Sequence, residues 1–93
     1  MEEGTRVIIT VLGYDRIGII YNISKILAET SVNILDISQT ILQGFFTMVM
    51  VVDMARATVD VAELRRLLAE KGREMGMEIT TQHEDIFNFM HRI

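Results

Sequence analysis

The spacing of apolar residues, and the order in which that spacing changes, constrains this fold most. A short, β-branched, almost continuously apolar run near the start predicts a strand covered on both faces. The run that follows has the 3.6-residue period of an amphipathic helix. Two further strands, joined at a tight Gln43-Gly44 hairpin, come next. After them the spacing of apolar residues changes again from that of a strand to that of a helix. In chain order, the predicted elements are strand 6–12, helix 17–30, strand 33–43, strand 45–54, helix 61–75 and strand 77–83.

This order predicts an α+β protein with the ferredoxin-like βαββαβ sandwich, a four-stranded antiparallel sheet with two helices on one face. In that arrangement the first and third strands are central and the second and fourth are edges. The first and third are apolar throughout, while the second and fourth alternate, as this arrangement requires. The 93 residues suffice for one domain over 1–93, with its core at about 6–83.

Local signals set the predicted ends of the helices. Asp15 is expected to cap the first helix, Asp60 and Glu63 spell a capping box for the second, and Gly76 is a natural stop. Residues 85–93 predict a short C-terminal helix, whose apolar side carries Ile86, Phe87, Phe89, Met90 and Ile93. Either this extension or a second copy of the chain is expected to cover the open face of the central strands.

Composition disfavours several classes of protein. The net charge is −4, and the basic residues of the second helix alternate with glutamates, so no nucleic-acid partner is expected. No apolar run approaches the roughly 20 residues of a membrane-spanning helix, and the acidic start does not resemble a secretory signal. We therefore expect no membrane association and a cytoplasmic location, which the absence of cysteine also fits.

The sequence shows no arrangement typical of catalysis. No nucleophile is paired with a base, and no glycine-flanked serine elbow is present. The two histidines, His83 and His91, lack metalloprotease spacing, so an edge-strand histidine followed by helix-capping acids is favoured over a metal site. We expect no catalytic residue, no metal and no cofactor.

The segment between the first strand and the first helix, Gly13–Ile20, is the most informative. It puts glycines beside a helix N-terminus, where backbone N–H groups and the helix dipole favour a carboxylate or phosphate. Any strand-to-helix loop also needs a cap and a glycine or two. From these residues alone, a ligand site and a plain helix entry are equally supported.

Two motifs resemble the ACT domain family: Gly13-x-Asp15-Arg16-x-Gly18-Ile19, and Val32-Asn33-Ile34 at the opening of the second strand. The chain is similar above all to short stand-alone ACT proteins. It is also similar to the ACT modules of glycine-cleavage repressors and formyltetrahydrofolate deformylases. The shared segments are Asp36-Ile37-Ser38-Gln39-Thr40, Gly44-Phe45-Phe46-Thr47-Met48 and Asp85-Ile86-Phe87.

The resemblance implies a homodimer, joined edge to edge or face to face, with small ligands, usually amino acids, bound at the interface. Ile17 stands where proline is common in the family, and Gly13 where some amino-acid binders have histidine. The ligand-binding residues that the resemblance implies are Gly13, Asp15, Arg16, Ile17, Gly18, Ile19, Asn33 and Ile34.

The expected function is that of a non-enzymatic regulatory module, which binds a small metabolite, best an amino acid, and acts on a separate protein. Asp15 is expected to face the ligand's ammonium group, while Arg16 or the helix amides meet its anionic end. Asn33 is expected to contribute from the adjoining strand or the partner chain. The alternative is a ligand-free dimerisation or protein-interaction module, and an enzyme is the least favoured reading.

Overall fold

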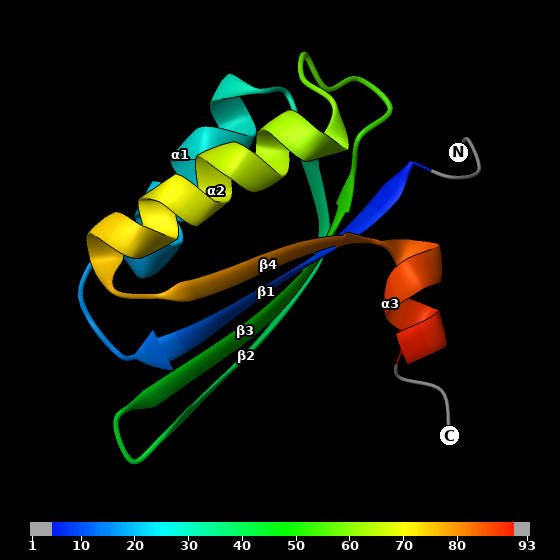
Figure 1. Cartoon of the computed structure of the whole chain (residues 1–93). Helices are drawn as coiled ribbons and strands as arrows, with labels where there is room; N and C mark the ends of the chain where they lie inside the picture. Colours follow the sequence, from blue (N-terminus) through cyan, green and yellow to red (C-terminus); the bar gives the residue numbers. More distant parts are fainter. Residues whose placement is uncertain (1–4, 91–93) are drawn as a thin grey trace.

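The computed structural model of the protein describes residues 5–90, without the side chains of Phe89 and Met90. Its sheet has the strand order β2-β3-β1-β4, and every neighbouring pair is antiparallel. The predicted ferredoxin-like arrangement, with central first and third strands, is therefore confirmed (Figure 1). The elements are β1 (Arg6–Tyr14), α1 (Ile19–Glu29), β2 (Asn33–Leu42), β3 (Phe45–Asp53), α2 (Val61–Met75), β4 (Glu78–His83) and α3 (Glu84–Met90).

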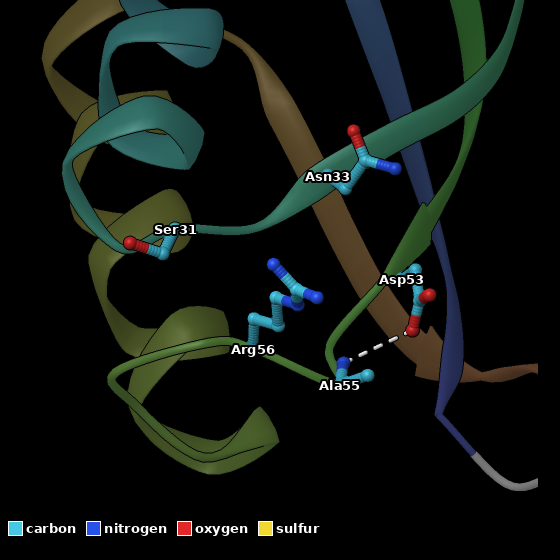
Figure 2. A pocket seen from close by; sticks show the side chains of 5 residues that line it. All are labelled: Ser31, Asn33, Asp53, Ala55 and Arg56. Atoms are coloured by element: carbon cyan, nitrogen blue, oxygen red, sulfur yellow. Dashed lines mark hydrogen bonds between the residues drawn. The ribbon is translucent and has the colours of Figure 1, made fainter. Parts of the chain in front are cut away.

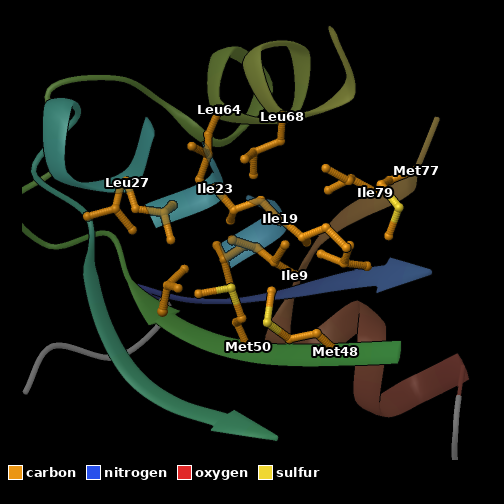
Figure 3. Close-up of a cluster of buried hydrophobic side chains, with 14 of the residues drawn as sticks. Ile9, Ile19, Ile23, Leu27, Met48, Met50, Leu64, Leu68, Met77 and Ile79 are labelled. Carbon is orange, nitrogen blue, oxygen red and sulfur yellow. The ribbon is translucent and has the colours of Figure 1, made fainter. Parts of the chain in front are cut away.

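The hydrophobic core lies between the sheet and the two longer helices. Ile9 of β1 and Met48 and Met50 of β3 point toward α1 and α2 (Figure 3). Ile23 of α1 and Leu68 of α2 meet them from the other side, and all five side chains are fully buried. Both helices thus cover one face of the sheet, as the apolar stripes of the sequence predict.

The start and end of α2 and the hairpin between β2 and β3 lie at the residues that the sequence predicts. Asp60 caps α2, because its Oδ1 accepts a hydrogen bond from the Glu63 backbone N–H at 2.8 Å. Gly76 ends α2 in the left-handed conformation, with φ 70°. Gln43 and Gly44 both have positive φ, 52° and 85°, as a two-residue hairpin turn requires. The Asp60 cap, the Gly76 stop and the hairpin turn are therefore confirmed. The Glu63 carboxylate, expected to complete a capping box, instead accepts hydrogen bonds from Arg66.

Other boundaries differ from the expectation. β1 continues through Gly13 to Tyr14 because these residues pair with Phe46 and Phe45. The register of β2 against β3 shifts between Ile34 and Asp36, which leaves Leu35 as an extra, unpaired residue. Alternating polarity alone did not predict this bulge, since a bulge changes the pairing and not the residue types.

The third helix lies on the side of the sheet opposite α1 and α2 (Figures 1 and 3). It contacts β1 and β4, and Ile8 on that face is only 6% exposed. Tyr14, on the same face at the other end of β1, is 71% exposed. The predicted C-terminal helix is thus present from Glu84 to Met90, and it leaves the far end of the open face uncovered. Ile93 lies outside the described residues.

No helix within residues 5–90 is long and apolar enough to cross a membrane.

Candidate functional site

The loop between β1 and α1 is tied to the β2–β3 hairpin. The Asp15 backbone N–H donates to the Gly44 carbonyl oxygen at 2.7 Å, so the loop and the hairpin tip lie side by side. The helix begins only at Ile19, after Gly18 in the left-handed conformation with φ 90°. The prediction that Asp15 caps this helix is therefore wrong: Gly18 holds the capping position, and no side chain caps the first turn.

The Arg16 guanidinium is engaged by the end of α2. Its Nη1 donates a hydrogen bond to the carbonyl oxygen of Met75, in the last turn of α2. A cation at a helix C-terminus is stabilised both by the orphan carbonyl and by the negative end of the dipole. Arg16 thus holds the loop against α2, and this contact competes with the ligand-binding role expected for its guanidinium.

A cavity of about 290 Å³ opens beside the loop, between the start of α1 and the edge strand β2. Two of the other expected residues stand apart from it. The Ile17 side chain is fully exposed to solvent, and Gly13 lies in β1, where an added Cβ would stand 2.6 Å from the Met77 sulfur. An alanine at Gly13 would therefore displace the Met77 thioether. The cavity is lined by Asp15, Arg16, Gly18, Ile19, Ile20, Tyr21, Gln39, Ile41 and Phe46.

Asn33 and Ile34 lie at the opposite end of the sheet from this loop. Asn33 pairs with Asp53 at the end of β3, whereas the loop adjoins Tyr14, which pairs with Phe45 at the start of β3. Eight residue steps of β3, at roughly 3.3 Å each, put the two ends about 26 Å apart. One protomer therefore does not bring Asn33 to the loop, and Ile34 packs against the core.

Asn33 instead lines a second cavity, of about 470 Å³, together with Ser31, Asp53, Ala55 and Arg56 (Figure 2). Three chain segments meet here: the turn after α1, the start of β2, and the end of β3 with the loop that follows it. The Arg56 side chain extends from the loop after β3 into the space that Ser31, Asn33 and Asp53 surround. The volume falls within the range of roughly 300–1,000 Å³ that is usual for ligand pockets.

The charges of this second cavity are set locally. Hydrogen bonds from the Thr5 side chain and from the Ala55 backbone N–H hold the pKa of Asp53 below its ordinary value. Within residues 5–90, the guanidinium of Arg56 has no carboxylate within 4 Å. The sequence analysis did not single out Ser31, Asp53 or Arg56, because they belong to turn and strand-end segments without a motif of their own.

The part of the chain that the structure describes holds no group of three or more histidine, aspartate or glutamate side chains arranged to bind a metal ion. His83 stands 3.8 Å from Asp85, measured from Nδ1 to Oδ2, in a two-residue contact at the start of α3.

Comparison with known proteins agrees with this architecture. The family profile of the ACT domain matches residues 5–82. A UPF0237 protein of Methanocaldococcus jannaschii is 53% identical over 89 residues, which cover 96% of this chain and 99% of that protein. The solved structure of an ACT domain protein from Streptococcus pneumoniae superposes with a TM-score of 0.78 at 38% identity, over 91% of this chain and 96% of that one.

A more distant likeness concerns the fold alone. The solved structure of a glycine cleavage system transcriptional repressor has a TM-score of 0.75 at 19% identity, over 85% of this chain and 45% of that one. The matched profile, the close relatives and the sheet order all agree with the resemblance seen in the loop and strand motifs. The chain belongs to the ACT domain family of regulatory, ligand-binding modules, and its close relatives are the short UPF0237 proteins.

Proposed function

We propose that the protein is a non-enzymatic regulatory module whose two copies bind an amino acid between them and whose state is read by a separate protein. The observation that carries this proposal is the exposed edge of β2, together with the separation of Asp15 from Asn33 along it. Family membership supports the regulatory role, since ACT domains are regulatory ligand-binding modules.

The edge of β2 has the properties of a pairing surface. The strand is ten residues long and contains no lysine, arginine or proline, the residues that usually protect an edge from pairing. Ile37 and Ile41 are about half exposed on the helix side of this edge, and Ile20 of α1 lies exposed above them. The other edge, β4, is only six residues long. Pairing through β2 would therefore satisfy open backbone groups and bury apolar side chains.

Antiparallel pairing of two β2 strands about a two-fold axis would also complete the ligand site. The start of each β2 would then lie beside the end of its partner. Asn33 of the partner subunit would reach the hairpin end, where Asp15 is bonded to Gly44. Asp15 and Asn33 lie about 26 Å apart within one chain, but Asp15 of one chain and Asn33 of the partner subunit would be neighbours in such a dimer.

The groups gathered there suit an amino acid. The Asp15 carboxylate is not used as a helix cap, so it is available to an ammonium group. The first-turn amides of α1 have no side-chain cap, so they can donate to a carboxylate. The partner's Asn33 supplies a carboxamide that can both donate and accept.

A hybrid-dimer experiment tests this arrangement. Asp15→Ser and Asn33→Ala variants are each screened by thermal shift against the proteinogenic amino acids, alone and after mixing. If Asp15 of one chain and Asn33 of the other build each site, a mixed dimer carries one doubly altered site and one intact site. Binding should therefore be lost in each variant and return to one of the two sites in each mixed dimer. After random exchange of subunits, half of the dimers are mixed, so about a quarter of all sites should bind.

Two results would contradict the proposal. Sedimentation of the unaltered protein as a 10.6 kDa monomer at every concentration would exclude the proposed dimer interface. A screen in which no amino acid stabilises the protein would exclude an amino-acid ligand, because a ligand at a hundredfold excess over Kd stabilises the folded state by about 2.7 kcal/mol.

A specific observation favours a second function, docking of another polypeptide. The end of the open sheet face that α3 leaves uncovered carries Leu12, Tyr14, Leu42 and Phe45, and the rings of Tyr14 and Phe45 stack with centroids 4.8 Å apart. Under this alternative, the Tyr14→Ser/Leu42→Ser double variant would lose the polypeptide partner while it keeps its oligomeric state. Under the first proposal, the same variant would still bind its amino acid.

A further inference from the structure

The cavity formed by Ser31, Asn33, Asp53, Ala55 and Arg56 has the lining of a second ligand site. We infer that it binds a small zwitterion, a compound with both a carboxylate and an ammonium group, and that Arg56 is the anchor for the carboxylate. All five residues belong to one protomer, so this site does not require the interface proposed above and shares only Asn33 with it.

Arg56 is available for an anion. Its guanidinium extends into the cavity (Figure 2), and no carboxylate within residues 5–90 lies close enough to form an ion pair with it. By contrast, Arg66 is bound to both Glu63 and Glu70, at 2.7 Å each. Arginine presents a planar fork of donors that matches the two oxygens of a carboxylate. The carboxamide of Asn33, on the strand that pairs with β3 at Asp53, also lines the cavity and can add a third hydrogen bond.

The opposite wall supplies a negative charge. Asp53 keeps its carboxylate near the cavity, where Oδ1 accepts the Ala55 backbone N–H at 3.0 Å. An ionised carboxylate has about four acceptor positions, so this bond and the one from the Thr5 side chain leave room for an ammonium donor. A fixed carboxylate on the wall repels a dianion such as phosphate, and it attracts the positive end of a zwitterion. The two charged walls therefore select a ligand that carries both signs.

The backbone around the cavity is held in place without a ligand. The Thr58 N–H donates to the Thr30 carbonyl oxygen at 2.9 Å, which joins the loop after β3 to the turn after α1. The Ala57 N–H donates to the Met54 carbonyl oxygen at 3.0 Å within that loop. Because both walls are fixed in this way, a ligand would lose little affinity to the ordering of loops.

Ser31 separates the stability of the cavity rim from its binding groups. It has φ 58°, in the left-handed region, at a helix end where glycine is usually found. A serine in this conformation costs stability, and its hydroxyl points away from Asn33 and Arg56 (Figure 2). Ser31→Gly should therefore raise the melting temperature and leave the binding of the zwitterion unchanged.

The test is a titration of the ¹⁵N-labelled full chain, followed by NMR, with glycine, acetate, methylammonium and inorganic phosphate as probes. Glycine should bind more tightly than acetate or methylammonium and should shift the resonances of Asn33, Ala55 and Arg56. Arg56→Gln should raise the Kd for glycine at least tenfold, and Arg56→Lys should weaken binding less. Arg73→Gln, which removes an equal charge from an exposed position of α2, is the matched control and should leave the Kd unchanged.

Four outcomes would overturn the inference. Equal effects of Arg56→Gln and Arg73→Gln would show that only net charge matters. Tighter binding of phosphate than of glycine would exclude the zwitterion, and the absence of saturable binding of any probe would exclude the site. Shifts confined to residues 15–20 would assign the ligand to the loop, and they would leave the interface proposal intact. Binding that survives Asp15→Ser but not Arg56→Gln supports this site and counts against the loop.

Discussion

The guanidinium of Arg16 donates a hydrogen bond to the main-chain oxygen of Met75, so the loop that enters α1 is fastened to the end of α2. The two residues are 59 positions apart in sequence. The contact gives an orphan carbonyl at the C-terminus of α2 a charged partner.

Removal of this contact should destabilise the protein. Arg16→Ala leaves the Met75 carbonyl to water, and a hydrogen bond to a charged group contributes about 1.5–3 kcal/mol, with the lower end expected at this exposed position. Urea unfolding monitored by circular dichroism measures the loss. Arg73→Ala, which removes an exposed arginine in the same turn of α2, is the control, and equal losses in both variants would contradict the role of Arg16.

Two glycines should differ in their tolerance of a methyl group. In Gly13→Ala the new Cβ meets the flexible Met77 thioether at 2.6 Å, whereas in Gly72→Ala it meets the Met77 backbone oxygen at 2.7 Å and Ile79 at 3.1 Å. The end of a flexible side chain can move more readily than the Met77 backbone, whose N–H is bonded to the Gly72 carbonyl oxygen. Gly72→Ala should therefore cost more stability than Gly13→Ala, with both losses within the roughly 1–3 kcal/mol typical of overpacking. Melting temperatures of the two variants measure this order, and the reverse order would show that β4 shifts more readily than Met77.

The acid dependence of stability should involve Asp53. The bonds from Thr5 and Ala55 depress its pKa in the folded state below the ordinary value of 3.8. Its contribution is therefore present above about pH 4 and is lost as pH falls further, because the unfolded chain takes up the proton first. Asp53→Asn should reduce the slope of unfolding free energy against pH below about pH 4.

The control for this experiment is Glu63, whose pKa is lowered by its hydrogen bond with Arg66. Glu63→Gln should reduce the same slope without any effect on the cavity beside Arg56. A slope unchanged by Asp53→Asn would mean that its hydrogen bonds persist in the unfolded chain.

The third helix should stabilise the open face of the sheet. Phe87 is half-buried on α3, and α3 contacts the strand that carries Ile8. Phe87→Ala should lower the unfolding free energy by about 1–2 kcal/mol, less than for a fully buried side chain. Removal of residues 85–93 should lower it further, since Ile8 would become exposed. Asn88→Ala, at an exposed position, is the control. An unchanged melting curve for the truncated chain would assign α3 to docking instead.

Local chemistry made the fold predictable. Asp60, Gly76 and the Gln43-Gly44 turn act within a few residues of their own positions, and the apolar spacing indicated which strands are central. Asp15 shows where such reasoning fails. It is a suitable capping residue by type, but the helical backbone starts only after the left-handed Gly18.

The candidate sites depend on contacts between distant segments, and these were less predictable. The engagement of Arg16 by Met75 follows from where α2 ends in space, and no spacing in the sequence reports it. Arg56 faces Asn33 because two turns lie side by side, joined by the bond from Thr58 to Thr30. The separation of Asn33 from Asp15 could have been inferred, since the strand order already sets them at opposite ends of the sheet.

The length of β2 that separates Asp15 from Asn33 has a consequence for how such a protein would respond in a cell. A site completed by two copies has an apparent affinity that rises with the concentration of the protein itself, because assembly and ligand binding are thermodynamically linked. By the same reciprocity, the ligand would favour assembly. The protein would then respond both to its own concentration and to that of the metabolite. A fall in either concentration would favour dissociation of the dimer and release of the ligand.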